Sequence, residues 1–221
     1  MELIKSSGFF EPKGVARCHI IGCGSVGSTV ADLLARFGLD KISIYDFDVV
    51  EEHNIVNQMF TSSDFGLAKV DAVAAHLMDI NPAMEGLKVF RDGYTDQKLN
   101  GYVFLCVDSI ELRRKICEAA KMNNMIKAVF DFRTRLTDAQ HFAADWTSPV
   151  DRESLLNSMA FTDGEAAEQT PASACGITLG VAPTVRMICN AGVANFVNFV
   201  KGQPLKRCIF LDAFNFTLDA F

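Results

Sequence analysis

Residues 17–48 read RCHIIGCGSVGSTVADLLARFGLDKISIYDFD, and this stretch decides the fold. A short apolar run, 18–21, breaks into Gly22, Gly24 and Gly27, after which residues 28–37 carry apolar side chains at helical spacing. Gly38 ends this helix, and a second β-rich run stops at Asp46. Strand, turn, helix and strand in this order predict a βαβ unit with a right-handed crossover, and therefore a parallel sheet.

The remainder of the chain continues the alternation of strands and helices. The patterns predict helices over 69–78, 111–121 and 181–200, and strands over 87–90, 102–107, 128–132 and 140–145, with a terminal strand or hairpin over 208–216. The polar, small and acidic residues 148–173 predict a long mobile loop. We therefore expect an α/β protein with a Rossmann-like, mainly parallel sheet flanked by helices, an antiparallel C-terminal extension, and one domain over 1–221.

Composition limits the compartment and the partners. The chain has 221 residues, of which 49% are hydrophobic, enough to bury the core of one α/β domain. Its formal charge of −6, without a local Lys/Arg cluster, argues against a nucleic-acid partner. Charged residues interrupt the first twenty positions, so we expect neither a secretory segment nor a membrane span, and a cytoplasmic protein. Its seven scattered cysteines form no CxxC pair, which predicts reduced thiols and no structural zinc.

The glycine turn is a candidate phosphate site. Gly22, Gly24 and Gly27 lie between a strand and a helix, where the backbone turns sharply and helix N-terminal amides point at an anion. Asp46 follows about 20 residues later at a strand end, where a carboxylate accepts hydrogen bonds from ribose hydroxyls. This pair of features fits a dinucleotide or ATP, while the glycines alone also fit a purely structural turn.

An ordered series of short motifs follows the turn. Its members are Asp46-Phe47-Asp48, Asn54 with Asn57-Gln58, the helix-opening Lys69, Asn81-Pro82, and Val107-Asp108-Ser109. In this order and spacing, residues 17–113 resemble the E1-like activating-enzyme superfamily, the ThiF, MoeB and HesA group. The remainder of the chain resembles that family only loosely.

The resemblance implies an ATP-dependent adenylyltransferase. A carboxylate would attack the α-phosphorus of ATP and pyrophosphate would leave, with the protein supplying position and charge. The carboxylate would be the C-terminus of a small ubiquitin-like or sulfur-carrier protein, or of a peptide, and the enzyme would be a homodimer. The implied nucleotide-binding residues are Gly22, Gly24, Gly27, Asp46, Asp48, Asn54, Asn57, Gln58 and Lys69. Lys69, Asp108, Arg113 and Cys175 are the implied catalytic residues, with Asp108 also holding Mg²⁺.

Several of these residues also have simpler interpretations. Lys69 suits a solvated surface cation, although the helix dipole disfavours a cation at a helix start, and Asp108 suits a cap of the following helix. Cys175, before the apolar helix, is either a thiol that accepts an acyl group or a small packing residue. The helix over 181–200 and the phenylalanines of the C-terminal tail suit a dimer interface, although a helix this apolar also suits the core.

One departure from the family pattern leaves the activity open. The family commonly has Arg-Gln where this chain has Asn57-Gln58, so a guanidinium expected on the triphosphate is replaced by a neutral amide. Its charge would have to come from Lys69, a metal, a partner subunit, or an arginine among Arg113, Arg133 and Arg135. Two alternatives therefore remain beside the enzyme: a weak or inactive nucleotide-binding scaffold of the same fold, and an NAD-dependent dehydrogenase. Asn54, Lys69 and the lack of a recognisable His or Tyr acid disfavour the dehydrogenase.

Overall fold

One eight-stranded sheet organises the chain. The computed structural model describes residues 2–6, 8–82, 84–174 and 179–221. The strand order is β3-β2-β1-β4-β5-β6-β7-β8, with β1 to β5 parallel and β6, β7 and β8 each antiparallel to the preceding strand. The strands are β1 Cys18–Ile21, β2 Ile42–Tyr45, β3 Lys88–Phe90, β4 Gly101–Leu105, β5 Ile126–Thr134, β6 Asp138–Asp145, β7 Cys208–Asp212 and β8 Thr217–Ala220. The predicted Rossmann-like fold class with an antiparallel C-terminal extension is confirmed.

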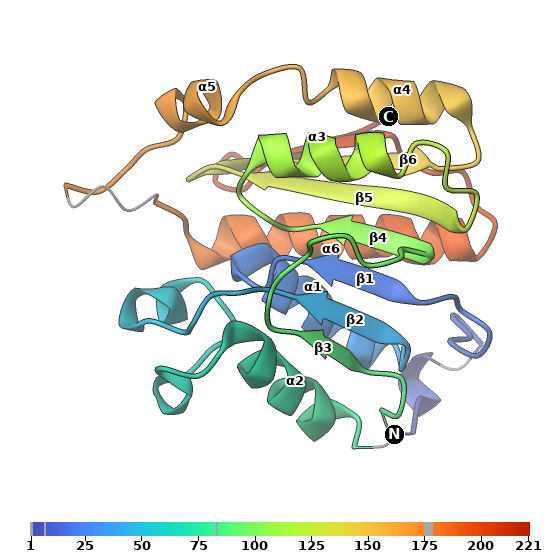
Figure 1. Cartoon of the computed structure of the whole chain (residues 1–221), viewed down its shortest axis with the longest axis horizontal. Helices are drawn as coiled ribbons and strands as arrows, with labels where there is room; N and C mark the ends of the chain where they lie inside the picture. The colour runs from blue at the N-terminus through green and yellow to red at the C-terminus, as the bar shows by residue number, and fades with distance from the viewer. Residues whose placement is uncertain (1, 7, 83, 175–178) are drawn as a thin grey trace.

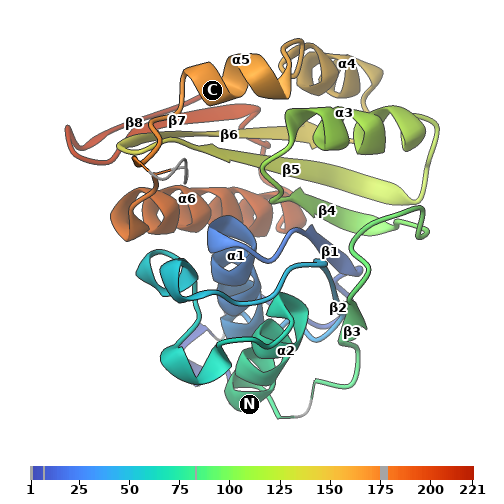
Figure 2. The same ribbon diagram turned by 60° about the vertical axis from the view of Figure 1, so that its left-hand side comes forward.

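Helices cover both faces of the sheet (Figures 1 and 2). Helices α1 Ser25–Arg36, α2 Lys69–Ile80 and α6 Ala182–Val200 pack on one face, and α3 Ile110–Ala119 and α4 Pro149–Asn157 pack on the other, with α5 Asp163–Glu168 against α3. Short 3₁₀ helices lie at Ile4–Ser6, Glu52–Val56 and Ser62–Asp64. The parallel strands point toward the left in Figure 1, so their carboxyl ends form one edge of the molecule.

Side chains that alternate along the strands contribute to two hydrophobic cores, one on each face of the sheet. Ile20, Ile44 and Phe104 face α1 and α6, whereas Ile21 and Leu105 face α3 and α4. Because both faces are covered, the strands in the middle of the sheet are buried along their whole length, and β4 is also wholly apolar.

The segment 148–173 differs from the predicted mobile loop. Ser148 accepts a hydrogen bond from the Asp151 amide and caps α4, which opens with Pro149. Thr162 and Glu165 form a capping box at the start of α5. The polar composition of 148–173 led to the prediction of a loop, although some of its polar residues are the caps of two short helices. α4 then packs its apolar side against β6.

The two candidate dimer surfaces behave differently. Helix α6 packs against α1 and strands β5 to β7, so its apolar face belongs to the core of the chain. The side chains of Phe210, Phe214, Phe216 and Phe221 on the β7–β8 hairpin are exposed. Among the described helices, none is long and apolar enough to cross a membrane.

Candidate functional site at the carboxyl edge of the sheet

The glycine turn lies where the direction of chain winding reverses. β1 pairs with β2 on one side and with β4 on the other, and the turn follows β1 directly. The carboxyl ends of parallel strands at such a switch point form the usual ligand crevice of open α/β sheets. The sheet topology therefore puts the predicted phosphate site where this fold binds ligands.

Backbone packing requires two of the three glycines. Gly22 has φ 95°, and a Cβ there would lie 2.8 Å from the backbone of Cys106 and Val107. A Cβ on Gly27 would lie 1.8 Å from the carbonyl oxygen of Gly22. These glycines therefore let the turn press against β4 and close upon itself.

Gly24 has a different environment. A Cβ at this position would meet nothing within 4 Å, so the space over the turn is open. Gly24 is the N-cap of α1, and no side chain caps the helix. The first helical amide to find an acceptor is that of Ser28, which donates to the Gly24 carbonyl over 3.0 Å. The preceding amides at this end of α1 are available to an anion.

Asp46 and Asp48 tie the turn to the end of β2. The Asp46 carboxylate accepts hydrogen bonds from the Cys23 amide at 2.6 Å and from the Asp48 amide at 2.8 Å. Asp48 in turn accepts from the ammonium of Lys69 at 2.8 Å, and its carbonyl accepts from the Lys69 amide at 2.9 Å. Lys69, the first residue of α2, is only 8% exposed. This burial and pairing are inconsistent with a freely solvated surface cation.

The segment between β2 and α2 forms a hollow beside these residues. Asn54 is buried, and its side-chain oxygen accepts from the Glu51 amide at 2.9 Å, which fixes the 3₁₀ helix Glu52–Val56. Asn57 is turned toward the loop before α6, where its amide donates to the Gly180 carbonyl at 3.1 Å. The side-chain oxygen of Gln58 is buried and has no hydrogen-bond partner in the described part of the chain. The hollow is lined by Phe47, Asp48, Glu51, His53, Asn54 and Lys69.

Asp108 and Arg113 follow β4 but face different surroundings. Asp108 is exposed, and no described residue forms a hydrogen bond or ion pair with it. Ser109, the next residue, is the N-cap of α3 and accepts from the Leu112 amide at 3.0 Å. Asp108 is therefore not the helix cap that its position in the sequence also suggested.

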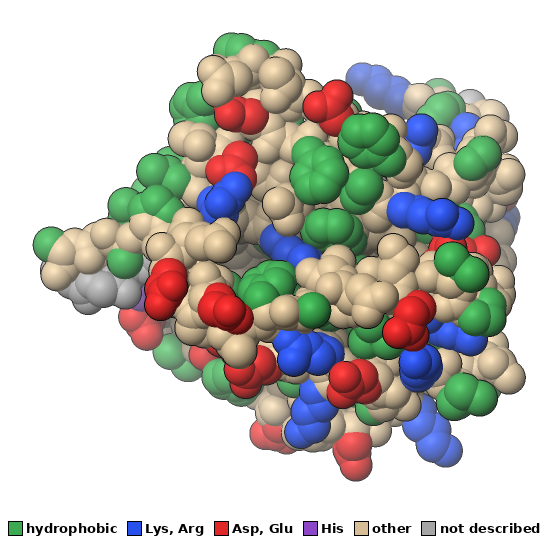
Figure 3. Space-filling model, turned by 90° about the horizontal axis from the view of Figure 1, so that it is seen from above, with side chains coloured by type: hydrophobic (Ala, Val, Ile, Leu, Met, Phe, Trp, Pro, Cys, Tyr) green, Lys and Arg blue, Asp and Glu red, His purple; other side chains and the backbone are tan. Residues whose placement is uncertain are grey.

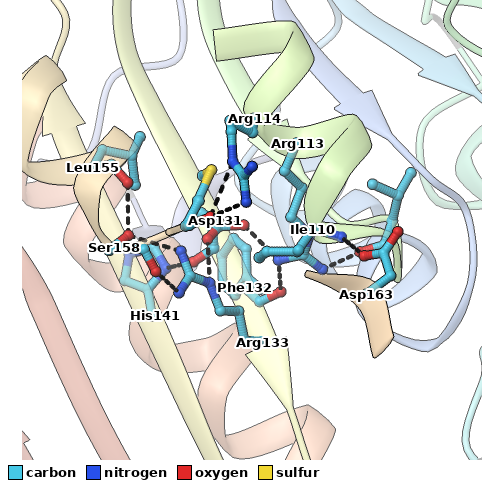
Figure 4. A network of polar contacts seen from close by, with 12 residues as sticks. Ile110, Arg113, Arg114, Asp131, Phe132, Arg133, His141, Leu155, Ser158 and Asp163 are labelled. Atoms are coloured by element: carbon cyan, nitrogen blue, oxygen red, sulfur yellow. Dashed lines mark hydrogen bonds and ion pairs between the residues drawn. The ribbon is translucent and has the colours of Figure 1, made fainter. Parts of the chain in front are cut away.

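The predicted phosphate contact of Arg113 needs correction. Its guanidinium, buried beneath α3, donates to the Asp131 carboxylate at 2.5 Å, to the Phe132 carbonyl at 2.6 Å, and to the Val107 carbonyl (Figure 4). All of these acceptors belong to the sheet or to the turn after β4. Arg113 therefore fixes the turn that carries Asp108. Both terminal nitrogens of its guanidinium donate to protein acceptors, and its Nε is buried without a hydrogen-bond partner among the described residues.

The same network contains two carboxylates that sequence reasoning missed, Asp131 and Asp163, and it engages Arg133, which was a candidate cation for the triphosphate. Asp131, fully buried on β5, also pairs with Arg133 at 2.7 Å, and Arg133 donates to both the hydroxyl and the carbonyl of Ser158 (Figure 4). Asp163 of α5 accepts from the Ile110 amide at 2.5 Å, next to Asp108. These contacts join the 148–168 segment to the carboxyl edge. On the face above this network, seen in Figure 3, acidic and basic side chains are interspersed with hydrophobic ones.

Cys175 lies outside the described residues, so its predicted role stays a prediction. The described cysteines have free thiols. Burial raises the pKa of Cys23 in the turn, and likewise the pKa of Cys106 and Cys189. These three thiols are therefore protonated near neutral pH and unsuited to nucleophilic attack.

A family model describes nearly the whole chain. The ThiF family model matches residues 13–221. This chain belongs to the ThiF family. The resemblance seen in the glycine turn and the motifs after it is thereby confirmed, and it extends to the C-terminal half, where the sequence motifs were weak.

Curated relatives share part of this ThiF chain. Ubiquitin-like modifier-activating enzyme 5 of Drosophila mojavensis is 33% identical over 142 residues, which cover 57% of this chain and 35% of that protein. The enzyme of the same name from Bombyx mori is 34% identical over 113 residues, covering 44% and 29%. The chain thus spans about a third of the length of these relatives.

Solved structures share the fold. E. coli MccB, in a crystal structure with ATP, covers 93% of this chain with a TM-score of 0.66 and 17% identity, and the match spans 63% of MccB. PaaA gives a TM-score of 0.69 at 17% identity, with the same coverage. At this identity the likeness shows that the ThiF chain and these proteins have the same fold.

Proposed function

We propose that this ThiF-family chain uses ATP and Mg²⁺ to adenylate the C-terminal carboxylate of a small ubiquitin-like or sulfur-carrier protein, or of a peptide. One observation carries the proposal. The uncapped N-terminus of α1, the Asp46 carboxylate and the buried Lys69 ammonium meet at the switch point of the sheet. A nucleotide triphosphate needs amide donors for phosphate, an acceptor for its ribose and a cation close by.

The residues present fit ATP. Phosphate would approach the turn over Gly24, where no side chain stands, and meet the free amides of α1. Asp46 keeps carboxylate lone pairs for a ribose hydroxyl, because the amides of Cys23 and Asp48 use only part of its acceptor capacity. Lys69 is held by Asp48 at the mouth of the hollow and would reorient onto phosphate when ATP binds.

Magnesium would be held mainly by the nucleotide. The described residues contain no cluster of three or more potential metal ligands. Mg²⁺ typically takes one or two carboxylates, with waters and substrate phosphates filling the other positions. Asp108, exposed and unpaired within the described chain, fits such a ligand, and Arg113 keeps its turn in place through Val107. Bound Mg²⁺ would neutralise charge that develops on the phosphates.

The relatives support the substrate class. The curated relatives are named for activating ubiquitin-like modifiers, and MccB has been crystallised with a second molecule, MccA. In our proposal this chain positions an incoming carboxylate against the α-phosphorus, and its amides and cations stabilise the charge as pyrophosphate leaves. Cys175 would then accept the acyl group from the adenylate if the reaction continues to a thioester.

ATP–pyrophosphate exchange tests the proposal. Exchange should require ATP, Mg²⁺ and a carrier with a free C-terminal carboxylate, and both Lys69→Ala and Asp108→Ala should abolish it. Lys121→Ala and Asp79→Ala are matched controls, because both side chains are exposed and lie away from the hollow. Full exchange by Lys69→Ala would contradict the proposed role of the site.

A nucleotide-binding scaffold is the second candidate. It is favoured by Asn57, which brings no cation to the site and whose amide is engaged by the Gly180 carbonyl. A scaffold would bind MgATP in calorimetry but support no exchange with any carrier, whereas the enzyme would do both. NAD titration should produce no binding heat in either case.

A homodimer remains part of the proposal. The exposed phenylalanines of the β7–β8 hairpin support it, since clustered large apolar side chains at a sheet edge favour association. Light scattering coupled to size exclusion should give twice the mass of the chain. The double variant Phe214→Ser with Phe216→Ser should shift that mass toward the monomer.

A further inference from the structure

Helix α6 carries a single charged side chain. Its sequence, APTVRMICNAGVANFVNFV, contains no charged residue other than Arg186, which stands near the N-terminal end. The helix dipole disfavours a cation at this end, so Arg186 does not serve the stability of the helix. Its charge requires another explanation.

The guanidinium of Arg186 contacts a neutral group. It lies against the thioether sulfur of Met59, and no described carboxylate pairs with it. Lys69, by contrast, is paired with Asp48, and Arg113 is paired with Asp131. A thioether is a weak hydrogen-bond acceptor. Among the described residues, Arg186 is therefore a half-buried cation without a carboxylate partner, whereas Lys69 and Arg113 each have one.

A short chain of contacts connects Met59 with the glycine turn. The Met59 amide donates to the Ser28 hydroxyl at 3.2 Å, and that hydroxyl donates to the Gly24 carbonyl at 2.7 Å. Two further contacts hold the N-terminal part of α6 in place: Asn57 donates to the Gly180 carbonyl, and the Cys189 thiol contacts the Val26 carbonyl at 3.7 Å. Arg186 thus lies beside the segment that borders the proposed phosphate site.

We propose that Arg186 binds the β- and γ-phosphates of the nucleotide and replaces the cation that Asn57 does not provide. This inference rests on the proposed function. A planar guanidinium offers paired donors that match phosphate oxygens, and the flexible, weakly held Met59 side chain releases it at little cost. The arginine comes from a helix more than a hundred residues further along the chain, and folding brings it to the same flank of the turn.

Calorimetric titration of the whole chain with three probes tests this role. For Arg186→Gln we expect MgATP affinity to fall about 10–100-fold, the range for a lost hydrogen bond to a charged group. Adenosine and AMP affinities should remain within about 2-fold, because the proposed contact is with the β- and γ-phosphates. Arg186→Lys keeps the charge, so its MgATP affinity should lie between that of the unaltered chain and that of Arg186→Gln. Arg36→Gln, which removes an exposed arginine at the far end of α1, is the matched control for net charge.

The outcomes separate this inference from the proposed function. If the unaltered chain releases no heat with MgATP, the proposed function itself fails. If the unaltered chain binds MgATP and Arg186→Gln binds it equally well, only the assignment of Arg186 is overturned. Equal losses for AMP and ATP would also overturn it, because they would indicate a general disturbance of the site.

A compensating substitution gives an independent reading. Adding Asn57→Arg to Arg186→Gln should recover most of the lost MgATP affinity, since a guanidinium from position 57 would start from the same border of the turn. If the double variant binds MgATP as weakly as Arg186→Gln and its melting temperature is unchanged, the idea that Arg186 replaces a cation at position 57 is contradicted.

Discussion

Alanine substitutions at Gly27 and Gly24 separate what the turn does for the fold from what it does for a ligand. A Cβ at Gly27 would stand 1.8 Å from the Gly22 carbonyl oxygen and 2.8 Å from its carbonyl carbon, and these backbone atoms cannot move aside easily. Overpacking typically costs about 1–3 kcal/mol, occasionally more. In a chain of this size that corresponds to a fall of roughly 2–12 °C in Tm. A Cβ at Gly24 meets nothing within 4 Å, so its cost is that of a poorer N-cap, about 1 kcal/mol or less.

At Gly24 we expect the reverse of Gly27: a small effect on stability and a large effect on ligand binding. Gly24→Ala should retain a Tm close to that of the unaltered chain but lose most of its MgATP affinity, because the new methyl group occupies the path of the phosphates to the amides of α1. Thermal unfolding by circular dichroism and calorimetric titration measure the two effects on the same samples. The reasoning is refuted if Gly27→Ala unfolds at the temperature of Gly24→Ala, or if Gly24→Ala binds MgATP normally.

Three further predictions concern the buried polar groups. Arg113→Met should lower the free energy of unfolding by about 3–5 kcal/mol in urea titrations, because it leaves the fully buried Asp131 short of a partner. Burial opposes ionisation of Asp163, but hydrogen bonds from Ser109 and the amides of residues 110 and 111 outweigh it and lower the pKa. The contact should therefore protect the Ile110 amide from hydrogen exchange above about pH 4, and protection should disappear as the pH falls through the lowered pKa. Desolvation lowers the pKa of His141 to about 4 from 6.5, so the folded state loses stability as the pH falls from 6.5 toward 4, and His141→Gln should reduce that loss in urea titrations across this range.

Each of these predictions has its own control. Arg36→Met removes an arginine whose side chain is 58% exposed, and its buried partner Asp32 keeps a second partner, His76. It should therefore cost about 1 kcal/mol or less, and a similar cost for Arg113→Met would contradict the argument from burial. For Asp163, Glu168→Gln should leave exchange of the Ile110 amide unchanged, whereas Asp163→Asn should speed it at neutral pH. Exposed His53 is the control for His141, and an equal effect of His53→Gln would rule out burial as the cause.

Part of the site could be predicted because its determinants are local. Gly22, Gly24, Gly27 and Asp46 lie within one βαβ unit, where the ends of β1 and β2 fix the position of the turn and of the Asp46 side chain. Lys69 was recognised from its motif, and the structure adds that it is buried and held by Asp48. Cap residues could have revealed α4 and α5, but the acidic composition of 148–173 indicated a loop more strongly.

Other predictions failed or were absent because they depend on partners distant in sequence. Arg113 was placed on the phosphates, yet its guanidinium lies under α3 with a carboxylate eighteen residues away. Asp163 meets the start of α3 across 53 positions, and Arg186 meets Met59 across 127. The one sequence signal for Arg186 was its isolation among the apolar residues of the helix over 181–200, which the sequence assigned to a dimer interface or to the core.

Sequence patterns were sufficient to predict the alternation of strands and helices outside 148–173, the glycine turn and the family of the chain. These follow from hydrophobic periodicity and from backbone conformations that only glycine adopts easily, and both operate over a few residues. Only the folded chain shows which carboxylate Lys69 and Arg113 face, and that Arg186 has none among the described residues. Ion pairs form between residues that are distant in sequence and are brought together when helices pack against the sheet. Because the chain contains many carboxylates, the sequence alone does not specify which of them pairs with a given guanidinium.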